Sequence, residues 1–405
     1  MNILFLTMSS GFANVEARGI YTDLMRKFRD EGHDVYIICP NERRTGKHTE
    51  LNVTGKIHCL GVRTLNVTKT NIIEKGIGQL LLERQFKSAL KKYYGSLRFD
   101  IILYSTPPIT FNKVIKYAKA ISGERSLTYL LLKDIFPQNA VDLGLMKTTG
   151  LQGLLYKVFR NKERELYRIS DWIGCMSPAN ARYVIEHNPG IDSTKVELAP
   201  NSIEIVSSGI DFKESNRKIL EKYGLPADKP IFIYGGNLGL PQGIPYLIEC
   251  LEANSNRKDC HFLVVGSGTY YQKLEDWYES QTPDSVTVLN GLPKVEYDQL
   301  VRACQVGLIF LDYRFTIPNF PSRLLSYLEN RMPVICATDP NCDMGTIAED
   351  NHFGYYAPSN SVDAFTASVD KMLASDMERM GERGYEYLKA NYSVDNTYNS
   401  IIKHL

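Results

Sequence analysis

Apolar positions along the chain follow two spacings in alternation. Short, nearly continuous apolar runs, such as Asn2–Thr7, Asp34–Cys39 and Leu127–Leu132, are typical of strands buried on both faces of a parallel sheet. Between the first two runs, apolar residues recur at helical spacing from Ile20 to Glu31, and Gly32 stands where a helix C-cap is expected. A strand, a helix and a strand within about 40 residues form a βαβ unit, which predicts a parallel sheet.

The same alternation starts again after a charged stretch at residues 202–229. Further strands are expected at residues 231–234, 261–268, 285–291, 306–311, 333–338 and 353–358. Residues 41–75 are polar and predict an irregular segment, with a short apolar run around Ile57–Val62. The pattern predicts an α/β protein with two Rossmann-like doubly wound domains facing across a cleft. We expect an N-terminal domain at 1–205, a second domain at 206–385, and a C-terminal helix within 386–405 that packs back on the first domain.

Composition places the chain among globular proteins. Hydrophobic residues make up 43% and charged residues 23% of its 405 residues, and no apolar run approaches the roughly 20 residues of a membrane span. The apolar N-terminus lacks a basic region and a cleavage site, so it predicts a first strand rather than a signal peptide. The eight cysteines show no C-x-x-C spacing, which indicates reduced thiols in a cytoplasmic protein.

Charge is distributed unevenly although the net charge is only +1. Up to Ile205 there are 29 Lys and Arg against 20 Asp and Glu, a net +9; from Val206 onward there are 18 against 26, a net −8. The predicted helix from Leu151 to Ile169 carries five Lys and Arg and an apolar stripe, which we expect to be buried, of Leu154, Leu155, Val158, Phe159 and Leu166. This basic half could face an anionic membrane peripherally, or its charges could simply be solvated.

One stretch combines a strand, glycines and a helix start. Ile231–Gly243 has the sequence IFIYGGNLGLPQG, and a helical pattern follows from Ile244. Backbone N–H groups at a helix N-terminus are unpaired, the helix dipole favours negative charge there, and glycine lets the backbone approach a phosphate. The stretch predicts an anion site, with an ordinary strand-to-helix turn as the alternative.

Polar residues also follow two strands of the first half. Ser105-Thr106-Pro107-Pro108 ends one strand, and Asp134 follows another. Ligands bind at the carboxyl edges of such sheets. Asp134 could contact a ligand there, or it could cap a helix or pair with Lys133 or Arg125. The seven histidines show no metal-ligand spacing such as H-x-x-x-H.

Taken together, these motifs resemble the GT-B glycosyltransferases, in particular the retaining family-four (group one) enzymes of bacterial polysaccharide and lipid-linked oligosaccharide assembly. The resemblance covers essentially the whole chain and rests on the order of short motifs. These are Gly32-His33-Asp34-Val35, Ser105-Thr106-Pro107-Pro108, Asp134-Ile135-Phe136-Pro137, Ala199-Pro200-Asn201-Ser202, the glycine stretch, Val265-Gly266-Ser267-Gly268, and Phe320-Pro321-Ser322-Arg323-Leu324 followed by Pro333-Val334-Ile335.

The resemblance implies transfer of a hexose or N-acetylhexosamine from a nucleoside-diphosphate sugar, with a UDP-sugar as the expected substrate, to a lipid-linked or saccharide acceptor. It places the nucleotide in the C-terminal domain and the acceptor in the N-terminal domain. No D-x-D pair is present, so no metal and no cofactor are expected. The implied setting is capsule or other cell-surface polysaccharide synthesis in the cytoplasm, peripherally at the inner face of the membrane, with no nucleic-acid partner.

Carried over residue by residue, the resemblance assigns a set of site residues. Asp134 is the catalytic candidate; Gly236, Asn237, Gly239, Gln242, Gly266, Arg323 and Ser326 are donor-binding candidates; Gly11, Glu16 and Ser105 are acceptor-binding candidates.

The sequence departs from the family pattern in its charged groups. Asn237 and Gln242 stand where many relatives have Arg and Lys, and the two carboxylates of a Glu-x7-Glu pair are replaced by Pro318 and Ser326. The cation expected at the diphosphate is therefore Arg323, because a planar guanidinium binds phosphate in a bidentate manner. The missing carboxylates also leave open a catalytically silent GT-B protein that acts as an assembly partner. A GT-B sugar-nucleotide epimerase is a further alternative, which would need more His and Glu in the cleft.

Overall fold

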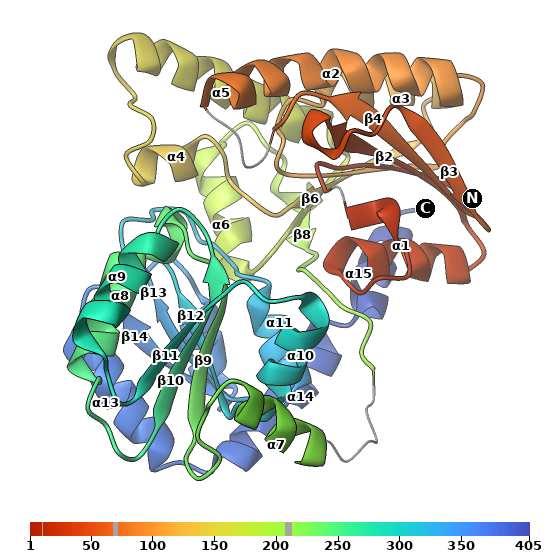
Figure 1. Ribbon diagram of the computed structural model, residues 1–405. Coiled ribbons are helices and arrows are strands. Elements are labelled where there is room, and N and C mark those ends of the chain that lie inside the picture. Colours follow the sequence, from red (N-terminus) through yellow and green to blue (C-terminus); the bar gives the residue numbers. More distant parts are fainter. Residues whose placement is uncertain (10, 68–71, 207–212) are drawn as a thin grey trace. The chain divides into compact units, whose positions relative to one another are not determined.

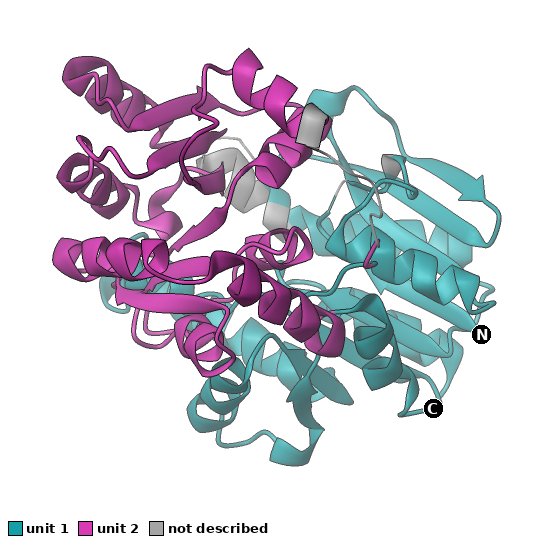
Figure 2. Ribbon diagram, turned by 90° about the horizontal axis from the view of Figure 1, so that it is seen from below, with its two compact units in different colours: residues 1–204, 393–405 teal, residues 205–392 magenta. Residues whose placement is uncertain are grey.

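The computed structural model describes residues 1–9, 11–67, 72–206 and 213–405. It divides into two compact units, which Figure 2 shows in separate colours. Unit 1 comprises Met1–Glu204 with Ser393–Leu405, and unit 2 comprises Ile205–Tyr392. Each unit is built around its own sheet with helices on both faces, so the α/β architecture of two Rossmann-like units is confirmed.

Unit 1 contains an eight-stranded sheet in the order β3-β4-β2-β1-β5-β6-β7-β8. The strands are β1 (Asn2–Leu6), β2 (Asp34–Glu42), β3 (Glu50–Thr54), β4 (Ile57–Thr64), β5 (Ile101–Ser105), β6 (Leu127–Leu132), β7 (Trp172–Cys175) and β8 (Val196–Leu198). All neighbouring pairs are parallel except β3 with β4. Every residue of β5 and β6 is buried, which explains their uninterrupted apolar sequences.

The helices of unit 1 cover both faces of this sheet (Figure 1). They are α1 (Ile20–Asp30), α2 (Ile72–Tyr94), α3 (Asn112–Ser122), α4 (Gln138–Asp142), α5 (Gly150–Ile169), α6 (Pro178–His187) and α15 (Val394–Ile402). The last helix packs on α1, where the Tyr398 hydroxyl lies 2.9 Å from Nε2 of His33 and Asp395 forms a 2.7 Å ion pair with Lys27. The end of the chain is thus fastened to the first helix of unit 1.

Unit 2 contains a fully parallel six-stranded sheet in the order β11-β10-β9-β12-β13-β14. Its strands are β9 (Ile231–Asn237), β10 (His261–Ser267), β11 (Val286–Asn290), β12 (Val306–Phe310), β13 (Val334–Thr338) and β14 (Gly354–Pro358). Its helices are α7 (Lys213–Lys222), α8 (Ile244–Ala253), α9 (Tyr271–Gln281), α10 (Lys294–Ala303), α11 (Arg323–Glu329), α12 (Met344–Asp350), α13 (Val362–Leu373) and α14 (Met377–Asn391).

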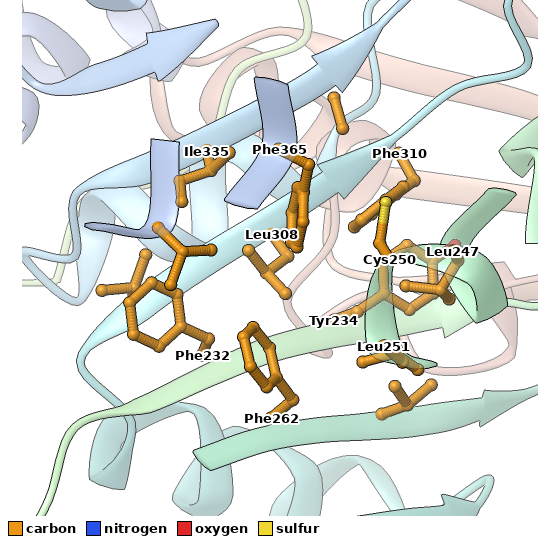
Figure 3. Packing of buried hydrophobic residues seen from close by; sticks show 14 of the residues in the cluster. Phe232, Tyr234, Leu247, Cys250, Leu251, Phe262, Leu308, Phe310, Ile335 and Phe365 are labelled. Carbon is orange, nitrogen blue, oxygen red and sulfur yellow. The ribbon is translucent and has the colours of Figure 1, made fainter. Parts of the chain in front are cut away.

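Aromatic and aliphatic residues together form the core on one face of the unit 2 sheet. Phe232, Phe262 and Phe310 from three adjacent strands meet Leu247 of α8 and Phe365 of α13, all of them fully buried (Figure 3). The ring centroids of Phe310 and Phe365 lie 5.3 Å apart, within the range of favourable aromatic contacts. This packing holds β9 and α8 together and so fixes the turn that joins them.

Two expectations about local structure are wrong. Residues 50–64 of the supposedly irregular segment form the antiparallel β3–β4 pair, at an edge of the sheet where Leu51 and Val53 are exposed. Of the apolar stripe of α5, Leu154, Leu155 and Val158 are exposed rather than buried. Leu166 is buried as expected, and it faces the protein interior together with Gly153, Glu163 and Tyr167. Among the described residues, we find no helix long and apolar enough to cross a membrane.

Candidate active site

The turn between β9 and α8 depends on glycine at several positions. Gly236 has φ 127° and Gly243 has φ 59°, backbone angles that favour glycine. A Cβ on Gly235 would overlap the hydroxyl of Tyr297, and a Cβ on Gly266, the partner of Gly236 in β10, would overlap the Gly236 carbonyl oxygen. Gly266 therefore acts as a spacer beneath the turn, which brings the backbone of residues 236–243 to the carboxyl edge of the sheet.

The two amide side chains of the turn bind each other. Nδ2 of Asn237 donates to Oε1 of Gln242 over 2.7 Å, and the backbone N–H of Gly239 donates to the same oxygen over 3.3 Å. The acceptor atom of Gln242 is thus occupied within the turn, whereas its Nε2 group can donate outward. Asn237 and Gln242, the positions at which the family resemblance would place Arg and Lys, are therefore uncharged and form a hydrogen bond with each other.

Arg323 supplies a cation next to this turn. It is the first residue of α11, and its guanidinium lies 4.3 Å from the centre of the Tyr234 ring. Nη2 lies 3.4 Å from the point that a Cβ on Gly236 would occupy. Nη1 is buried and has no hydrogen-bond partner within the described parts of the chain. A buried donor of this kind is costly unless a ligand accepts its hydrogen bond.

Two further tyrosines lie against the end of β9, close to Arg323. The Tyr327 hydroxyl, one helical turn beyond Arg323, accepts from the Gly235 N–H at 3.2 Å and donates to the Ile233 carbonyl at 3.1 Å. This bonding ties α11 directly to β9. Burial raises the pKa of Tyr297 to about 12, although Arg323 opposes the shift, so this hydroxyl is neutral at physiological pH.

Ser326 lies three residues after Arg323 on α11 and is half-buried. Its backbone carbonyl accepts from Nδ2 of Asn330 over 2.7 Å. Glu329 accepts a 3.5 Å hydrogen bond from the Val206 N–H. The structure therefore places Gly236, Asn237, Gly239, Gln242, Gly266, Arg323 and Ser326 at one edge of unit 2, on the β9–α8 turn, on its supporting strand and on α11.

A second group of polar residues gathers at the carboxyl edge of the unit 1 sheet. Oγ of Ser105, at the end of β5, donates to Oγ1 of Thr7 at 3.3 Å. Oγ1 of Thr106 accepts from the backbone N–H groups of Lys133 and Asp134 at 3.0 and 3.2 Å. These bonds join the ends of β5 and β6 and fix the loop that carries Asp134.

The carboxylate of Asp134 is held by Asn139, whose Nδ2 lies 2.8 and 2.9 Å from its two oxygens. Burial raises the pKa of Asp134 to about 6, although the hydrogen bond from Asn139 opposes the shift. Burial raises the pKa of Tyr21 to about 12; a hydrogen bond with Ser105 opposes this, and the charge of Asp134 adds to it. Tyr21, Ser105 and Asp134 therefore form one electrostatically linked group.

Lys133 does not pair with Asp134. Its Nζ donates to the Ala199 carbonyl at 2.9 Å, and burial lowers the pKa of this amine to about 7. Nor does Asp134 cap a helix, because α4 begins at Gln138 with Pro137 as its N-cap residue. Asn139 is thus the side chain that holds Asp134.

The two remaining acceptor candidates lie in the loop after β1. Gly11 belongs to a short 3-10 turn (Gly11–Ala13) and is exposed, and its N–H donates to Oγ of Ser9 at 3.4 Å. The exposed carboxylate of Glu16 forms an ion pair with Arg29 of α1. The structure does not bring Glu16 into hydrogen-bond contact with Asp134 or Ser105, and the acceptor roles of Gly11 and Glu16 stay predictions.

Several residues of these groups were not found from the sequence. The signal for Tyr327 was available, because it stands four residues after Arg323, the spacing of one helical turn. Asn139 stands five residues after Asp134 in the short helix α4, whose position relative to Asp134 the sequence does not define. Tyr297 comes from a helix distant in sequence, and no pattern links it to Arg323.

Within the described ranges, no cluster of His, Cys, Asp or Glu is arranged to hold a metal ion.

Family comparisons cover most of the chain. A family model described as "Glycosyltransferase Family 4" matches residues 20–206, and one described as "Glycosyl transferases group 1" matches residues 215–387. The chain is 22% identical over 334 residues to a probable glycosyltransferase, WbjE, of Pseudomonas aeruginosa, a match that covers 80% of this chain and 78% of WbjE. It is 25% identical over 188 residues to the alpha-D-kanosaminyltransferase of Streptomyces kanamyceticus, covering 45% and 47% of the two chains.

Solved structures share the fold. Sucrose-phosphate synthase from Thermosynechococcus elongatus superimposes with a TM-score of 0.75 at 15% identity, covering 100% of this chain and 98% of that one. HepE of Anabaena, solved in complex with UDP-glucose, superimposes with a TM-score of 0.66 at 14% identity, covering 100% and 99%. Because glycosyltransferase models match both halves of the chain and its neighbours share its two-sheet architecture, this protein belongs to the group 1 glycosyltransferases of the GT-B fold.

Proposed function

We propose that this glycosyltransferase moves a hexose or N-acetylhexosamine from a UDP-sugar to a lipid-linked or saccharide acceptor, with retention of anomeric configuration, in cell-surface polysaccharide synthesis. The observation that carries the donor proposal is the buried, unpartnered Nη1 of Arg323 beside the glycine turn at Gly236. A diphosphate oxygen is the acceptor that this site lacks. The neighbouring structure of HepE contains UDP-glucose, which supports a uridine nucleotide.

On the donor side, unit 2 would stabilise the departing diphosphate without a metal. Arg323 would donate to phosphate oxygens, the backbone N–H groups of residues 236–243 would add neutral donors, and Gln242 would donate through Nε2. Donors that are already oriented stabilise developing negative charge without reorganisation, which is the main source of catalysis in such sites. Ser326, on the same helix as Arg323, would bond a ribose hydroxyl.

On the acceptor side, we assign residues 1–205 to the acceptor and residues 206–385 to the donor; of residues 386–405, only Ser393–Leu405 belongs to the first unit. Asp134 is the proposed catalytic group at the anomeric region of the sugar. With a pKa of about 6 it is mostly ionised at neutral pH and could stabilise positive charge on the sugar ring. Ser105 lies at the same sheet edge and would contact the acceptor, as would Gly11 and Glu16.

The test begins with donor binding. The purified protein is mixed with UDP-, GDP- and dTDP-sugars, and thermal unfolding and titration calorimetry are recorded without added metal and with EDTA. One donor class should raise the melting temperature, since a ligand that binds only the folded state stabilises it by mass action. Release of UDP in the presence of a polyprenyl-phosphate-linked saccharide, with NMR of the product anomer, then tests transfer and retention. No shift with any donor at millimolar concentration would contradict the proposal.

A second candidate function is supported by the absence of the Glu-x7-Glu pair, replaced here by Pro318 and Ser326. In this alternative the protein binds a nucleotide-sugar but does not turn it over, and serves as a partner in an assembly complex. Binding of UDP-sugar without release of UDP, across a panel of lipid-linked acceptors, would favour this alternative over the transferase.

A further inference from the structure

An exposed apolar ridge runs along α5 in unit 1. Leu151, Leu154, Leu155 and Val158 have exposed fractions of 92, 64, 47 and 48%, and Leu145, just before the helix, is 64% exposed. The spacing i, i+3, i+4, i+7 places the four helical residues on one face. A continuous exposed apolar surface on a folded protein marks an interaction site rather than an ordinary surface. We refer to these five residues as the α5 ridge.

Basic side chains border the α5 ridge. Lys157, Arg164 and Arg168 follow one flank of it at helical spacing, and Lys147 precedes the helix; all four are exposed. In the described part of the chain, none of the four forms an ion pair, whereas Arg160 and Lys162 of the same helix pair with Glu163 and Glu83. The cations at the ridge thus remain available to an external anion.

The flank ends in a surface depression of about 440 Å³. It is lined by Arg164, Arg168, Lys195 and residues 188–191, with no acidic residue among them. Nζ of Lys195 donates to the carbonyls of Tyr167 and Ser170 at 2.8 and 2.9 Å, which caps the C-terminal end of α5. Two free guanidinium groups around such a depression suit the phosphate of a lipid headgroup.

We propose that the α5 ridge docks on the surface of an anionic lipid bilayer. Aliphatic side chains would enter the boundary between headgroups and acyl chains, and Lys147, Lys157, Arg164 and Arg168 would lie among the anionic headgroups. Apolar residues with cations at their flank are the arrangement of an interfacial helix, which lies on a membrane without crossing it. The excess of 29 Lys and Arg over 20 Asp and Glu up to Ile205 adds a general attraction to such a surface.

This inference goes beyond the proposed transfer reaction and does not depend on it. The assay is flotation of the full chain with vesicles of phosphatidylcholine alone or mixed with phosphatidylglycerol, at low and high salt. We expect the protein to float with the phosphatidylglycerol vesicles at low salt, and to float less at high salt because salt screens the headgroup charge. The readout is independent of donor binding, so its failure would leave the transferase proposal intact.

Two variants separate the parts of the surface. Leu151→Ser with Leu154→Ser should reduce partitioning at least about tenfold, because two aliphatic side chains no longer enter the bilayer. Arg164→Gln with Arg168→Gln should reduce it about 10- to 30-fold on anionic vesicles only, on the basis of the attraction per cation near such a surface. All four residues are exposed, so the unfolding temperature should not change.

Matched controls carry the same changes elsewhere. Val53→Ser with Val295→Ser alters side chains that are 55 and 70% exposed on other elements. Lys91→Gln with Lys273→Gln removes two exposed cations of α2 and α9. Controls that float like the wild type, beside ridge variants that do not, would support the proposal. Absence of wild-type flotation, ridge variants that float normally, or a ridge-dependent dimer without vesicle binding would overturn it.

Discussion

Replacing Arg323 should separate donor binding from folding. In Arg323→Met the aliphatic stem is kept, but the guanidinium that lies beside Gly236 and over the Tyr234 ring is lost. A hydrogen bond to a charged group contributes about 1.5–3 kcal/mol, and Nη1 and Nη2 would both donate to the diphosphate in our proposal. Loss of one to two such bonds corresponds to about 10- to 20,000-fold weaker binding of UDP. Arg323→Lys keeps the charge without the planar pair of donors, so a smaller loss of about tenfold is expected.

The same substitution should leave the unliganded protein as stable as before. In the wild type the buried Nη1 lacks a partner within the described residues, which costs about 1–3 kcal/mol, whereas the stack on Tyr234 stabilises by about 0.5–2 kcal/mol. These contributions oppose each other, so Arg323→Met should lower the free energy of unfolding by no more than about 1 kcal/mol. A residue that served only to stabilise the fold would show the opposite pattern, with lost stability and unchanged affinity.

The assay is calorimetric titration with UDP, together with thermal unfolding with and without UDP. Arg331→Met is the matched control, because Arg331 also stacks on a tyrosine of unit 2, with its guanidinium 3.9 Å from the Tyr385 ring centre, but its carboxylate partner is Glu382. The control should bind UDP like the wild type. If folded Arg323→Met binds UDP within about twofold of the wild type, the assignment of Arg323 to the diphosphate is refuted.

Two further predictions concern the other parts of the site. Asp134→Asn should lower the transfer rate at least about 100-fold with little change in UDP affinity, and the wild-type rate should fall as the pH drops through about 6, the pKa of Asp134. Because this pKa is raised in the folded protein, the native state binds more protons than the unfolded chain between the ordinary value of 3.8 and about 6. Wild-type stability should therefore decrease as the pH rises through that window, and denaturant titrations should show a flatter dependence for Asp134→Asn. Gly266→Ala should destabilise unit 2 by about 1–3 kcal/mol and weaken UDP binding, since its Cβ would press on the Gly236 carbonyl; unchanged melting and affinity would contradict the spacer role.

The sequence allowed most of the fold to be predicted because parallel strands buried on both faces have apolar runs that stand out from helices. It failed at β3, where Leu51 and Val53 are exposed at an edge of the sheet and no apolar run forms. The proximity of Arg323 and Gly236 could be anticipated, since Gly236 lies at the carboxyl end of β9 and Arg323 follows the neighbouring strand β12 in the chain. The contact of Tyr297 with the turn could not, because it depends on how α10 packs.

Whether the apolar face of α5 is buried or exposed cannot be predicted from the periodicity of its sequence. A stripe at positions i, i+3, i+4 and i+7 shows that a helix has an apolar face, but not what that face contacts. In α5 the interior face is partly polar instead: the buried carboxylate of Glu163 accepts 2.6 Å and 2.8 Å hydrogen bonds from Arg160 and the Tyr167 hydroxyl. Burying an ionised group is costly unless it is paired in this way. Helix α5 buries an ion pair and exposes Leu151, so its orientation gives up free energy that burial of apolar side chains normally contributes. Contact of the α5 ridge with a lipid surface would bury these side chains and recover that free energy.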